Sequence, residues 1–362
     1  MTTNNNDALS RRSMCGSALY GATLVLAGCG GGGGGDAAPA ANSGGTAAPA
    51  AINGGLTGKM YYSFTSTVGI VDLASGNFTE ISRKISASGE LPFLYNSTYI
   101  ELSPDSKTLY FAETRVADKL TALDIASNTA KSVFALSSAS EWGEIRLSPD
   151  GQKVAMVRNG TSSKNGVYVF DTSGKTITFY AVNPDAANSI AWTSDNRLLY
   201  SNGGIYLTNP GDLKNALRIN TTSASSVSIS PAGNKIVYAA QGHIWTMGIA
   251  GDNVQQVTAG DNAEFQPRWS PDGKYIVFQN RIEGTVGGSV TSVNFLYYLG
   301  VIPADGKQYT IKKGGTSGST VCGLGCSAVT TTGITPGEGV ILLKVRSAGF
   351  LSDIAVYDMI WR

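Results

Sequence analysis

Short stretches in which apolar and polar residues alternate recur along most of the chain. Examples are Tyr99–Leu102, Glu144–Leu147 and Gln266–Trp269, and each ends at a cluster of Pro, Asp, Ser or Gly residues. A second β-rich stretch follows each cluster, as Thr108–Ala112 does. Alternation with a period of two is typical of half-buried strands, and no long stretch shows the 3.6-residue period of an amphipathic helix. The pattern predicts an all-β protein.

One turn motif separates the first two strands of every predicted repeat. Its proline presets φ, its aspartate accepts hydrogen bonds from backbone amides, and its glycine adopts a positive φ. Counted from the Ser or Thr, successive copies are 45, 45, 37, 40 and 65 residues apart. The first four intervals match the roughly 40–45 residues of a four-stranded propeller blade, and the last contains an insertion, Arg281–Val329. The copies are Leu102-Ser103-Pro104-Asp105-Ser106, Leu147-Ser148-Pro149-Asp150-Gly151, Trp192-Thr193-Ser194-Asp195-Asn196, Ile229-Ser230-Pro231-Ala232-Gly233, Trp269-Ser270-Pro271-Asp272-Gly273 and Ile334-Thr335-Pro336-Gly337-Glu338.

These copies resemble the TolB-like β-propeller repeat, whose blades carry an S-P-D-G turn between the first two strands. The resemblance covers nearly all of residues 59–362 and implies a propeller of four-stranded antiparallel blades. Five complete repeats and two partial ones predict seven blades, or six if the two terminal pieces combine in one shared blade. TolB has an additional N-terminal α/β domain, and a glycine-rich segment takes its place here.

The first residues of the chain carry the features of an export signal. Arg11 and Arg12 precede a weakly apolar stretch, Met14–Gly28, which is too short to span a bilayer as a helix. Leu26-Ala27-Gly28-Cys29 resembles the lipobox of bacterial lipoproteins, which implies that Cys29 is diacylated and becomes the first mature residue. Gly30 follows where an aspartate would mark inner-membrane retention, so the resemblance favours the outer membrane, facing the periplasm or the cell surface. The general and twin-arginine export routes both remain open.

Three segments are therefore expected. Residues 1–28 form a signal peptide that is removed, residues 29–56 form a flexible tether, and residues 57–362 form the propeller. The tether begins with six glycines, Gly30–Gly35, and continues with Ala, Pro, Asn and Ser, so it has almost no apolar surface to bury.

The charge balance excludes several classes of function. The chain has 27 basic and 26 acidic residues in 362, and removing residues 1–28 leaves a formal charge of zero. Nothing in this balance favours nucleic acid as a partner. Because the mature chain has no net charge, a lipid rather than electrostatic attraction would provide the membrane anchor. A single histidine, His243, argues against metal sites built on several imidazoles and against a His-based triad. We expect no cofactor, no metal and no catalytic residue set.

Four cysteines divide between processing and structure. Cys15 leaves with the signal peptide and Cys29 takes the lipid, which leaves Cys322 and Cys326. In an oxidising envelope these two can pair across the short loop between them. Their C-x3-C spacing differs from the C-x2-C of thioredoxin-like sites, so a pair here would be a structural staple rather than a redox centre.

The first strands of propeller blades line the central channel, so polar residues on them are candidates for a site. At two and four positions before the Ser or Thr of the turn lie Glu101, Glu144, Arg146, Gln266 and Arg268. These side chains either bind a polar ligand at the channel mouth or form ion pairs with one another. The aspartates of the turn motif are expected to fix their own turns rather than to bind cations.

These features together predict a membrane-anchored envelope lipoprotein. The expected molecule is a monomer whose propeller binds or scaffolds an envelope protein or a glycan. The alternative is an envelope polysaccharide hydrolase or lyase that uses channel-mouth carboxylates. That alternative requires two acids converging at about 5–10 Å.

Overall fold

A computed structural model describes the chain at residues 51–64, 67–81, 99–113, 119–136, 142–159, 165–181, 189–286, 293–322, 326–347, 350–353 and 358–362. The chain divides into two units, Met1–Ala48 and Pro49–Arg362, and all described residues belong to the second. Apart from one four-residue 3-10 helix, η1 (Ile52–Gly55), the regular elements of this part are all strands, which confirms the all-β prediction. No helix among the described residues has the length and apolar character needed to cross a bilayer.

Five of the seven sheets have four antiparallel strands each. In spatial order the first contains β29 (Asp358–Trp361), β1 (Lys59–Phe64), β2 (Thr67–Asp72) and β3 (Phe78–Glu80). The next two contain β4 (Ile100–Leu102), β5 (Thr108–Glu113), β6 (Lys119–Asp124) and β7 (Thr129–Ala135), then β8 (Trp142–Leu147), β9 (Lys153–Arg158), β10 (Gly166–Asp171) and β11 (Thr176–Ala181). The remaining two contain β12 (Ile190–Trp192), β13 (Leu198–Ser201), β14 (Ile205–Asn209) and β15 (Asp212–Asn220), then β16 (Ser226–Ile229), β17 (Lys235–Ala240), β18 (His243–Gly248) and β19 (Gln255–Gln256).

The other two sheets come from the last third of the chain. A seven-stranded sheet contains β20 (Thr258–Ala259), β24 (Tyr309–Cys322), β25 (Cys326–Pro336), β22 (Tyr275–Val286), β23 (Val293–Pro303) and β26 (Ile341–Leu342), with β21 (Glu264–Trp269) paired to β22. A separate two-stranded sheet contains β27 (Lys344–Ser347) and β28 (Phe350–Asp353).

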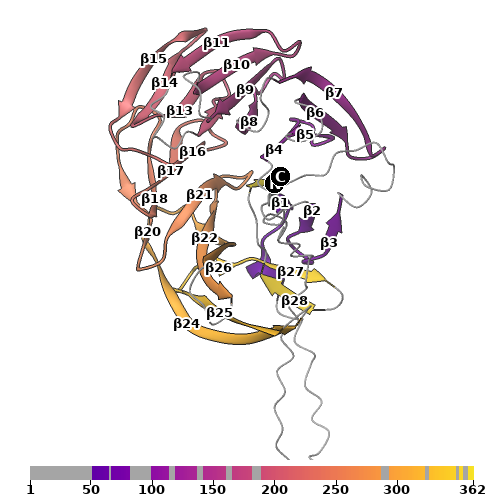
Figure 1. Cartoon of the computed structure of the whole chain (residues 1–362). Helices are drawn as coiled ribbons and strands as arrows, with labels where there is room; N and C mark the ends of the chain where they lie inside the picture. Colours follow the sequence, from indigo (N-terminus) through magenta and orange to yellow (C-terminus); the bar gives the residue numbers. More distant parts are fainter. Residues whose placement is uncertain are drawn as a thin grey trace, which may run out of the picture. The chain divides into compact units, whose positions relative to one another are not determined.

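Within the unit Pro49–Arg362 the sheets follow one another around a ring (Figure 1). Six apolar clusters join the five four-stranded sheets and the seven-stranded sheet, each cluster linking two neighbours in cyclic order. For example, Tyr61 and Val68 of the first sheet pack with Ile100 and Leu109 of the second. The alternating apolar residues therefore stabilise the ring by burying sheet faces against one another.

The ring closes through pairing of the two ends of the propeller. β29 pairs antiparallel with β1, with Met60 opposite Trp361 and Tyr62 opposite Met359. The two terminal pieces thus share one sheet, which is the arrangement for which the sequence predicts six blades. The last strand of the chain, β29, is the first strand of this shared sheet. The count of seven blades is not confirmed, since one of the seven sheets has only two strands.

The turn motif has the predicted geometry in five of its six copies. In the second copy Gly151 N–H donates to Ser148 O at 2.8 Å, Ser148 Oγ donates to Asp150 at 2.6 Å, and Lys153 N–H donates to Ser148 Oγ at 2.9 Å. The residue that follows the Asp or Ala of the motif has a positive φ in each of the five copies. This explains why most copies have glycine or asparagine there. These residues are Ser106 (60°), Gly151 (69°), Asn196 (63°), Gly233 (73°) and Gly273 (71°).

The prediction that the sixth copy of the turn motif separates two strands of a blade is wrong. Ile334–Pro336 is the end of β25 and pairs with Ile311–Lys313 of β24, so it does not enter a new blade. The copy has Gly337 where the others have Asp or Ala.

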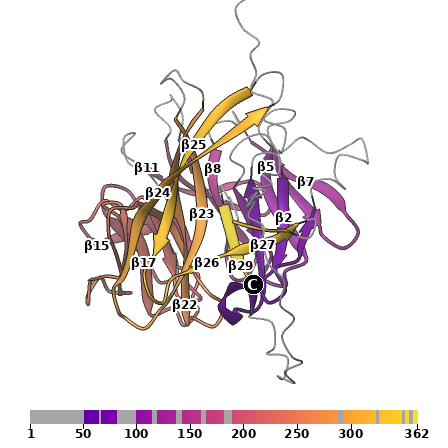
Figure 2. The ribbon, with the colours of Figure 1, turned by 90° about the horizontal axis from the view of Figure 1, so that it is seen from below.

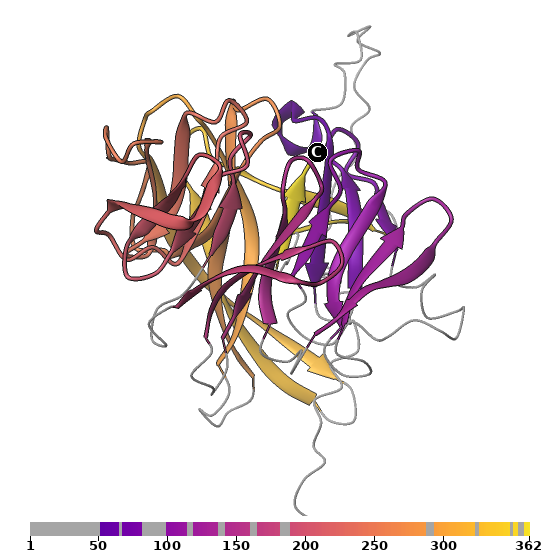
Figure 3. The same cartoon turned by 90° about the horizontal axis from the view of Figure 1, so that it is seen from above.

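The insertion Arg281–Val329 is built largely of strands in its described part. β22 and β23 pair along Tyr275–Thr285, β24 and β25 form a second hairpin, and Gly284–Val286 of β22 pairs with β25. β24 and β25 extend past the other sheets on one side (Figures 2 and 3). Because β22 leaves the turn motif at Tyr275 and meets β25 at its other end, this extension lies on the face opposite the turns. We call the paired segments 281–286, 293–298, 314–322 and 326–333 the arm.

The predicted tether ends earlier than residue 56. Leu56 is 4% exposed in an apolar cluster with Met60 and Leu343. Asn53 is also buried: its Nδ2 donates to Leu73 O at 3.0 Å and to Lys344 O at 3.2 Å, and its Oδ1 accepts from Lys344 N–H at 2.6 Å. Residues 52–56 are therefore part of the folded unit, because they bury an apolar side chain and satisfy backbone groups of β27.

Candidate functional site: a charged cluster in the channel

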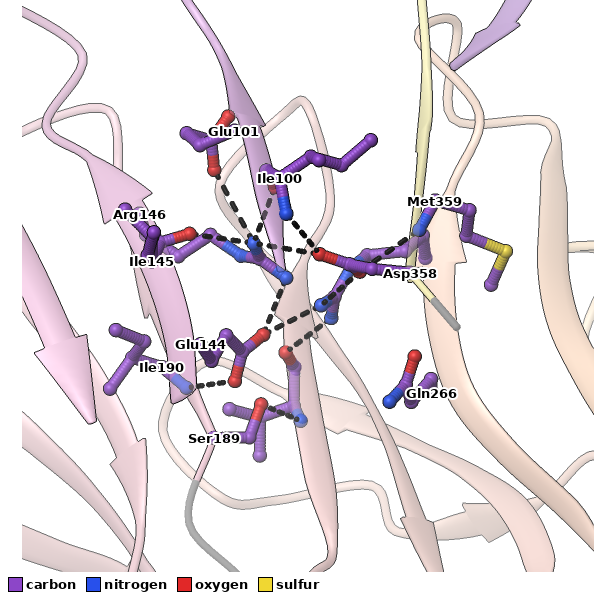
Figure 4. Close-up of polar contacts among 12 residues, drawn as sticks. Ile100, Glu101, Glu144, Ile145, Arg146, Ser189, Ile190, Gln266, Asp358 and Met359 are labelled. Carbon is purple, nitrogen blue, oxygen red and sulfur yellow. Dashed lines mark hydrogen bonds and ion pairs between the residues drawn. The ribbon is translucent and has the colours of Figure 1, made fainter. Parts of the chain in front are cut away.

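The structure brings four of the five predicted channel residues into one cluster. Glu101 lies on β4, Glu144 and Arg146 on β8, and Arg268 on β21, and Asp358 of β29 joins them (Figure 4). These are inner strands of their sheets, so their alternate side chains point toward the ring axis. The turn motif sets the register of each inner strand and thereby places its charges at one level.

Arg146 is the centre of this cluster. Its Nη2 lies 2.5 Å from Glu144 Oε1, and its Nη1 lies 3.5 Å from Glu101 Oε2 and 3.7 Å from Asp358 Oδ2. Nη1 also donates to Ile145 O at 2.7 Å. The side chain is 10% exposed, so the guanidinium exchanges its hydration for three carboxylates from three sheets.

Arg268 extends the cluster across the channel. Its Nη2 lies 2.6 Å from Glu144 Oε1 and 3.9 Å from Asp358 Oδ1, and its Nη1 donates to Val227 O at 3.2 Å. The second oxygen of Glu144 accepts from Ile190 N–H at 3.0 Å. Glu144 therefore links β8, β12 and β21, and is 5% exposed.

Asp358 is the residue that sequence reasoning missed. It is 1% exposed, accepts from Ile100 N–H at 3.1 Å and from Met359 N–H at 2.9 Å, and faces both arginines. Counting back from the sixth turn copy leads instead to Thr331 and Gly333, which lie on β25 and not on an inner strand. One signal was present: Trp361 follows Asp358 at the spacing at which Trp269 follows Gln266.

Burial raises the pKa of all three acids in the cluster. It raises the pKa of Glu101 to about 7 and the pKa of Asp358 to about 6, against the lowering effect of Arg146 on both. Burial also raises the pKa of Glu144, although Arg146 and hydrogen bonds from Ser189 and Ile190 oppose the rise. Three acids and two arginines would carry a net charge of −1 if all were ionised, and protonation of one acid would make the cluster neutral.

Gln266 lies outside the ion pairs. It accepts a hydrogen bond from Gln279 Nε2 at 2.8 Å and has a φ of 46°, at a register shift where β21 pairs with β22. This channel residue therefore lies at the backbone irregularity of β21 and is not part of the charged cluster.

The ion pairs weighed in the sequence analysis are thus present, and they limit the chemistry of the site. Both glutamates that an acid–base mechanism would use contact Arg146, and both are largely buried. A glycosidase needs one carboxyl group free to donate a proton and another free to act on water or sugar. The arrangement instead cross-links six inner strands, β4, β8, β12, β16, β21 and β29, and it counts against the hydrolase or lyase alternative.

The turn aspartates occupy their own turns. Asp105, Asp150 and Asp272 accept hydrogen bonds from the hydroxyl two residues earlier and from the backbone amide two residues later. The side-chain hydrogen bond from the turn hydroxyl is the main cause that lowers the pKa of each. Within the described residues, no cluster of three or more His, Cys, Asp or Glu side chains is arranged to hold a metal ion.

Of the cysteines with predicted roles, only Cys322 and Cys326 lie among the described residues. Cys29 lies outside the described residues. The backbone register of β24 and β25 places Cys322 opposite Cys326 at the end of the arm.

Comparison with known proteins supports the fold. TolB from Acinetobacter baumannii matches with a TM-score of 0.51 and 16% identity over 78% of this chain. The match spans 65% of the TolB chain, so about a third of TolB has no counterpart in it. Hydrazine synthase from Kuenenia stuttgartiensis matches with a TM-score of 0.42 and 19% identity, over 57% of this chain and 62% of that one. No protein-family model matches the chain, and no curated protein sequence matches it significantly. The likeness to TolB, together with the ring of antiparallel sheets, shows a TolB-like β-propeller fold.

Proposed function

We propose that this protein is a lipid-anchored envelope protein whose propeller binds another protein. The observation that carries the proposal is the channel cluster: its buried ion pairs hold the ring closed, so the polar residues of the channel have structural partners. Function then falls to the outer surfaces and the arm, which the closed ring holds in place. The TolB-like fold is consistent with this role.

Binding can be tested with the mature chain, starting at residue 29 and carrying Cys29→Ser so that it remains unacylated. Crosslinking in envelope extracts followed by mass spectrometry should enrich a defined protein partner above a heat-unfolded control. Enrichment of glycan alone, or of nothing above the control, would overturn the proposal.

The anchor rests on the lipobox-like residues ending at Cys29. Acylated protein should yield an N-terminal peptide that starts at Cys29 and carries the mass of a diacylglycerol, and globomycin should block its formation. Cys29→Ser should abolish acylation, whereas the matched variant Cys15→Ser should leave it intact. An unmodified N-terminal peptide in untreated cells would contradict the anchor.

We also infer a ring of six blades. Six apolar clusters link six sheets in cyclic order, and the sixth blade consists of β21, β22, β23 and β26. The two-stranded sheet of β27 and β28 lies beside β3, and Arg346 of β27 forms a parallel backbone β-bridge with Asn77. This sheet therefore adds to the rim of a neighbouring blade instead of forming a blade of its own.

A disulfide between Cys322 and Cys326 is proposed as the staple of the arm. Directly opposed residues of antiparallel strands have Cα atoms about 4.5–5.5 Å apart, which lies within the range that a disulfide spans. Non-reducing digestion and mass spectrometry of protein purified from the envelope should recover the linked peptides. Free thiols at both positions in that material would contradict the pair.

A further inference from the structure

We propose that the outer edge of β24 in the arm is a docking site for an extended segment of another protein, uncharged along the edge and acidic beside Lys312 and Lys313. This rests on the proposed binding function and names the surface and the chemistry of its partner. Addition of a strand to an exposed sheet edge is a common mode of peptide recognition, in which main-chain hydrogen bonds supply affinity.

The edge begins where β20 ends. On its inner side β24 pairs with β25 from Ile311 to Cys322. On its outer side it pairs with β20 only at Tyr309 and Thr310. From Lys312 to Cys322 no described strand covers the outer side, so a run of backbone donors and acceptors faces outward there.

Hydrogen bonds at the base of the arm show which way this edge faces. Tyr309 N–H donates outward to Val257 O at 2.9 Å, and Lys313 N–H donates to Asp261 Oδ1 at 2.7 Å. Asp261 thus accepts from an outward amide just past the two residues that pair with β20. Beyond it, no strand of the described residues pairs with this side of β24.

The outer part of the edge lacks the residues that usually protect edge strands. Gly314–Val321 contains glycine, serine, threonine and valine, with no charged residue and no proline. Natural edges are commonly guarded by lysine, proline, an inward-pointing charge or a bulge, and here both lysines and a register shift lie at the base, up to Thr316. Beyond that register shift the segment is compatible with an added strand.

Charge at the base selects the kind of partner. Lys312 and Lys313 are both exposed, and within the described part of the chain neither ammonium group forms an ion pair or hydrogen bond. β24 itself contains no acidic residue, so a second copy of this edge would leave all four lysines unpaired. A foreign strand with an acidic end would pair with them and complement the edge.

The edge is also accessible from the side away from the chain entry. Lys59 N–H donates to Arg362 O at 2.6 Å just after β29, which places the start of the propeller on the turn face. The arm extends on the opposite face, away from β1, near the start of the described residues (Figures 2 and 3).

The test uses a labelled twelve-residue peptide of alternating Thr, Val and Ser with three acidic residues at one end, made in both chain directions. The protein is the mature chain carrying Cys29→Ser. Fluorescence anisotropy should show saturable binding of at least one acidic peptide, and hydrogen exchange should slow at amides of residues 314–322. A peptide with three lysines in place of the acids should bind more weakly.

A charge swap separates docking from folding. Lys312→Glu with Lys313→Glu should weaken the acidic peptide roughly three- to tenfold and favour the lysine peptide, as expected for two exposed ion pairs. The matched pair Lys131→Glu with Lys235→Glu, at exposed lysines on β7 and β17, should leave both affinities unchanged.

Three outcomes would overturn the docking site. These are no binding of either acidic peptide, equal effects of the two double variants, and concentration-dependent dimerisation that slows exchange at residues 314–322 without peptide. The last would assign the edge to a second copy of this chain. If the envelope partner is still crosslinked by the Lys312→Glu, Lys313→Glu chain, the docking site fails while the binding function stands.

Discussion

The hydroxyls of Ser148 and Thr193, each at the start of a turn, have two functions in one buried position. Ser148 is 1% exposed, donates to Asp150 and accepts from Lys153 N–H, and Thr193 makes the same contacts with Asp195 and Arg197. The motif could be recognised in the sequence because both contacts are local, spanning two to five residues.

Ser148→Ala should lower the free energy of unfolding by about 1–3 kcal/mol, because Lys153 N–H loses its side-chain acceptor in a buried turn. Urea denaturation of the purified chain measures the change. Ser148→Thr is the matched control, since Thr193 already performs this role in the next repeat, and it should lie close to wild type. Equal losses in the two variants would show that packing rather than the hydroxyl is responsible.

Glu101 should make stability depend on pH in the opposite sense to a surface carboxylate. Its pKa is raised from 4.5 to about 7 in the folded protein, so the folded state holds the proton more tightly than the unfolded state. Its contribution is complete below about pH 4.5 and is lost as pH rises through about 7. Glu101→Gln, which mimics the protonated form, should flatten this fall in melting temperature between pH 5 and 8.

Asp105→Asn provides the contrasting control. The pKa of Asp105 is lowered by the hydroxyl of Ser103, so its contribution is present at neutral pH and is lost as pH falls through the folded pKa. The two variants should therefore change the pH profile in opposite directions. An unchanged slope in Glu101→Gln would show that Glu101 titrates as it does in the unfolded chain.

At the scale of elements, β29 decides whether the ring closes. It contributes only four residues, yet it pairs with β1, and its Asp358 contacts two arginines and the amide of Ile100. A short terminal strand pairs stably here because its one charged side chain contacts Arg146, Arg268 and the amide of Ile100.

Asp358→Ala should lower the free energy of unfolding by about 1–3 kcal/mol, because it leaves the buried Ile100 N–H without its acceptor. Differential scanning calorimetry should also show a broader transition as β29 detaches. Arg362→Ala, one residue past β29 and exposed, is the control and should have little effect. A stability equal to wild type in Asp358→Ala would mean that the backbone pairing of β29 suffices.

At the scale of the whole molecule, closure joins residues from both ends of the chain. Leu56 packs with Leu343, Asn53 bonds to Lys344, and β1 pairs with β29. The folded unit therefore includes the last residues of the segment that composition assigned to the tether.

A fragment of residues 49–362 should melt at the same temperature as the mature chain, whereas a fragment of residues 57–362 should be less stable. The loss should be about 2–5 kcal/mol, from the burial of Leu56 and the hydrogen bonds of Asn53. Asn53→Ala in the longer fragment isolates the second contribution. Identical melting of the two fragments would return residues 49–56 to the tether.

The sequence by itself determined the features that depend on near neighbours. Alternation specified strands, the turn motif specified five chain reversals, and counting back from the turn located Glu101, Glu144, Arg146 and Arg268 on one level. Only the tertiary structure decided how distant segments pair. Asp358 entered the site because β29 joins β1 across some 300 residues, and the insertion became an arm because β22 meets β25. Backbone hydrogen bonds between strands carry no side-chain code, so many pairings satisfy the same local pattern. The burial of whole sheet faces around a closed ring selects among them.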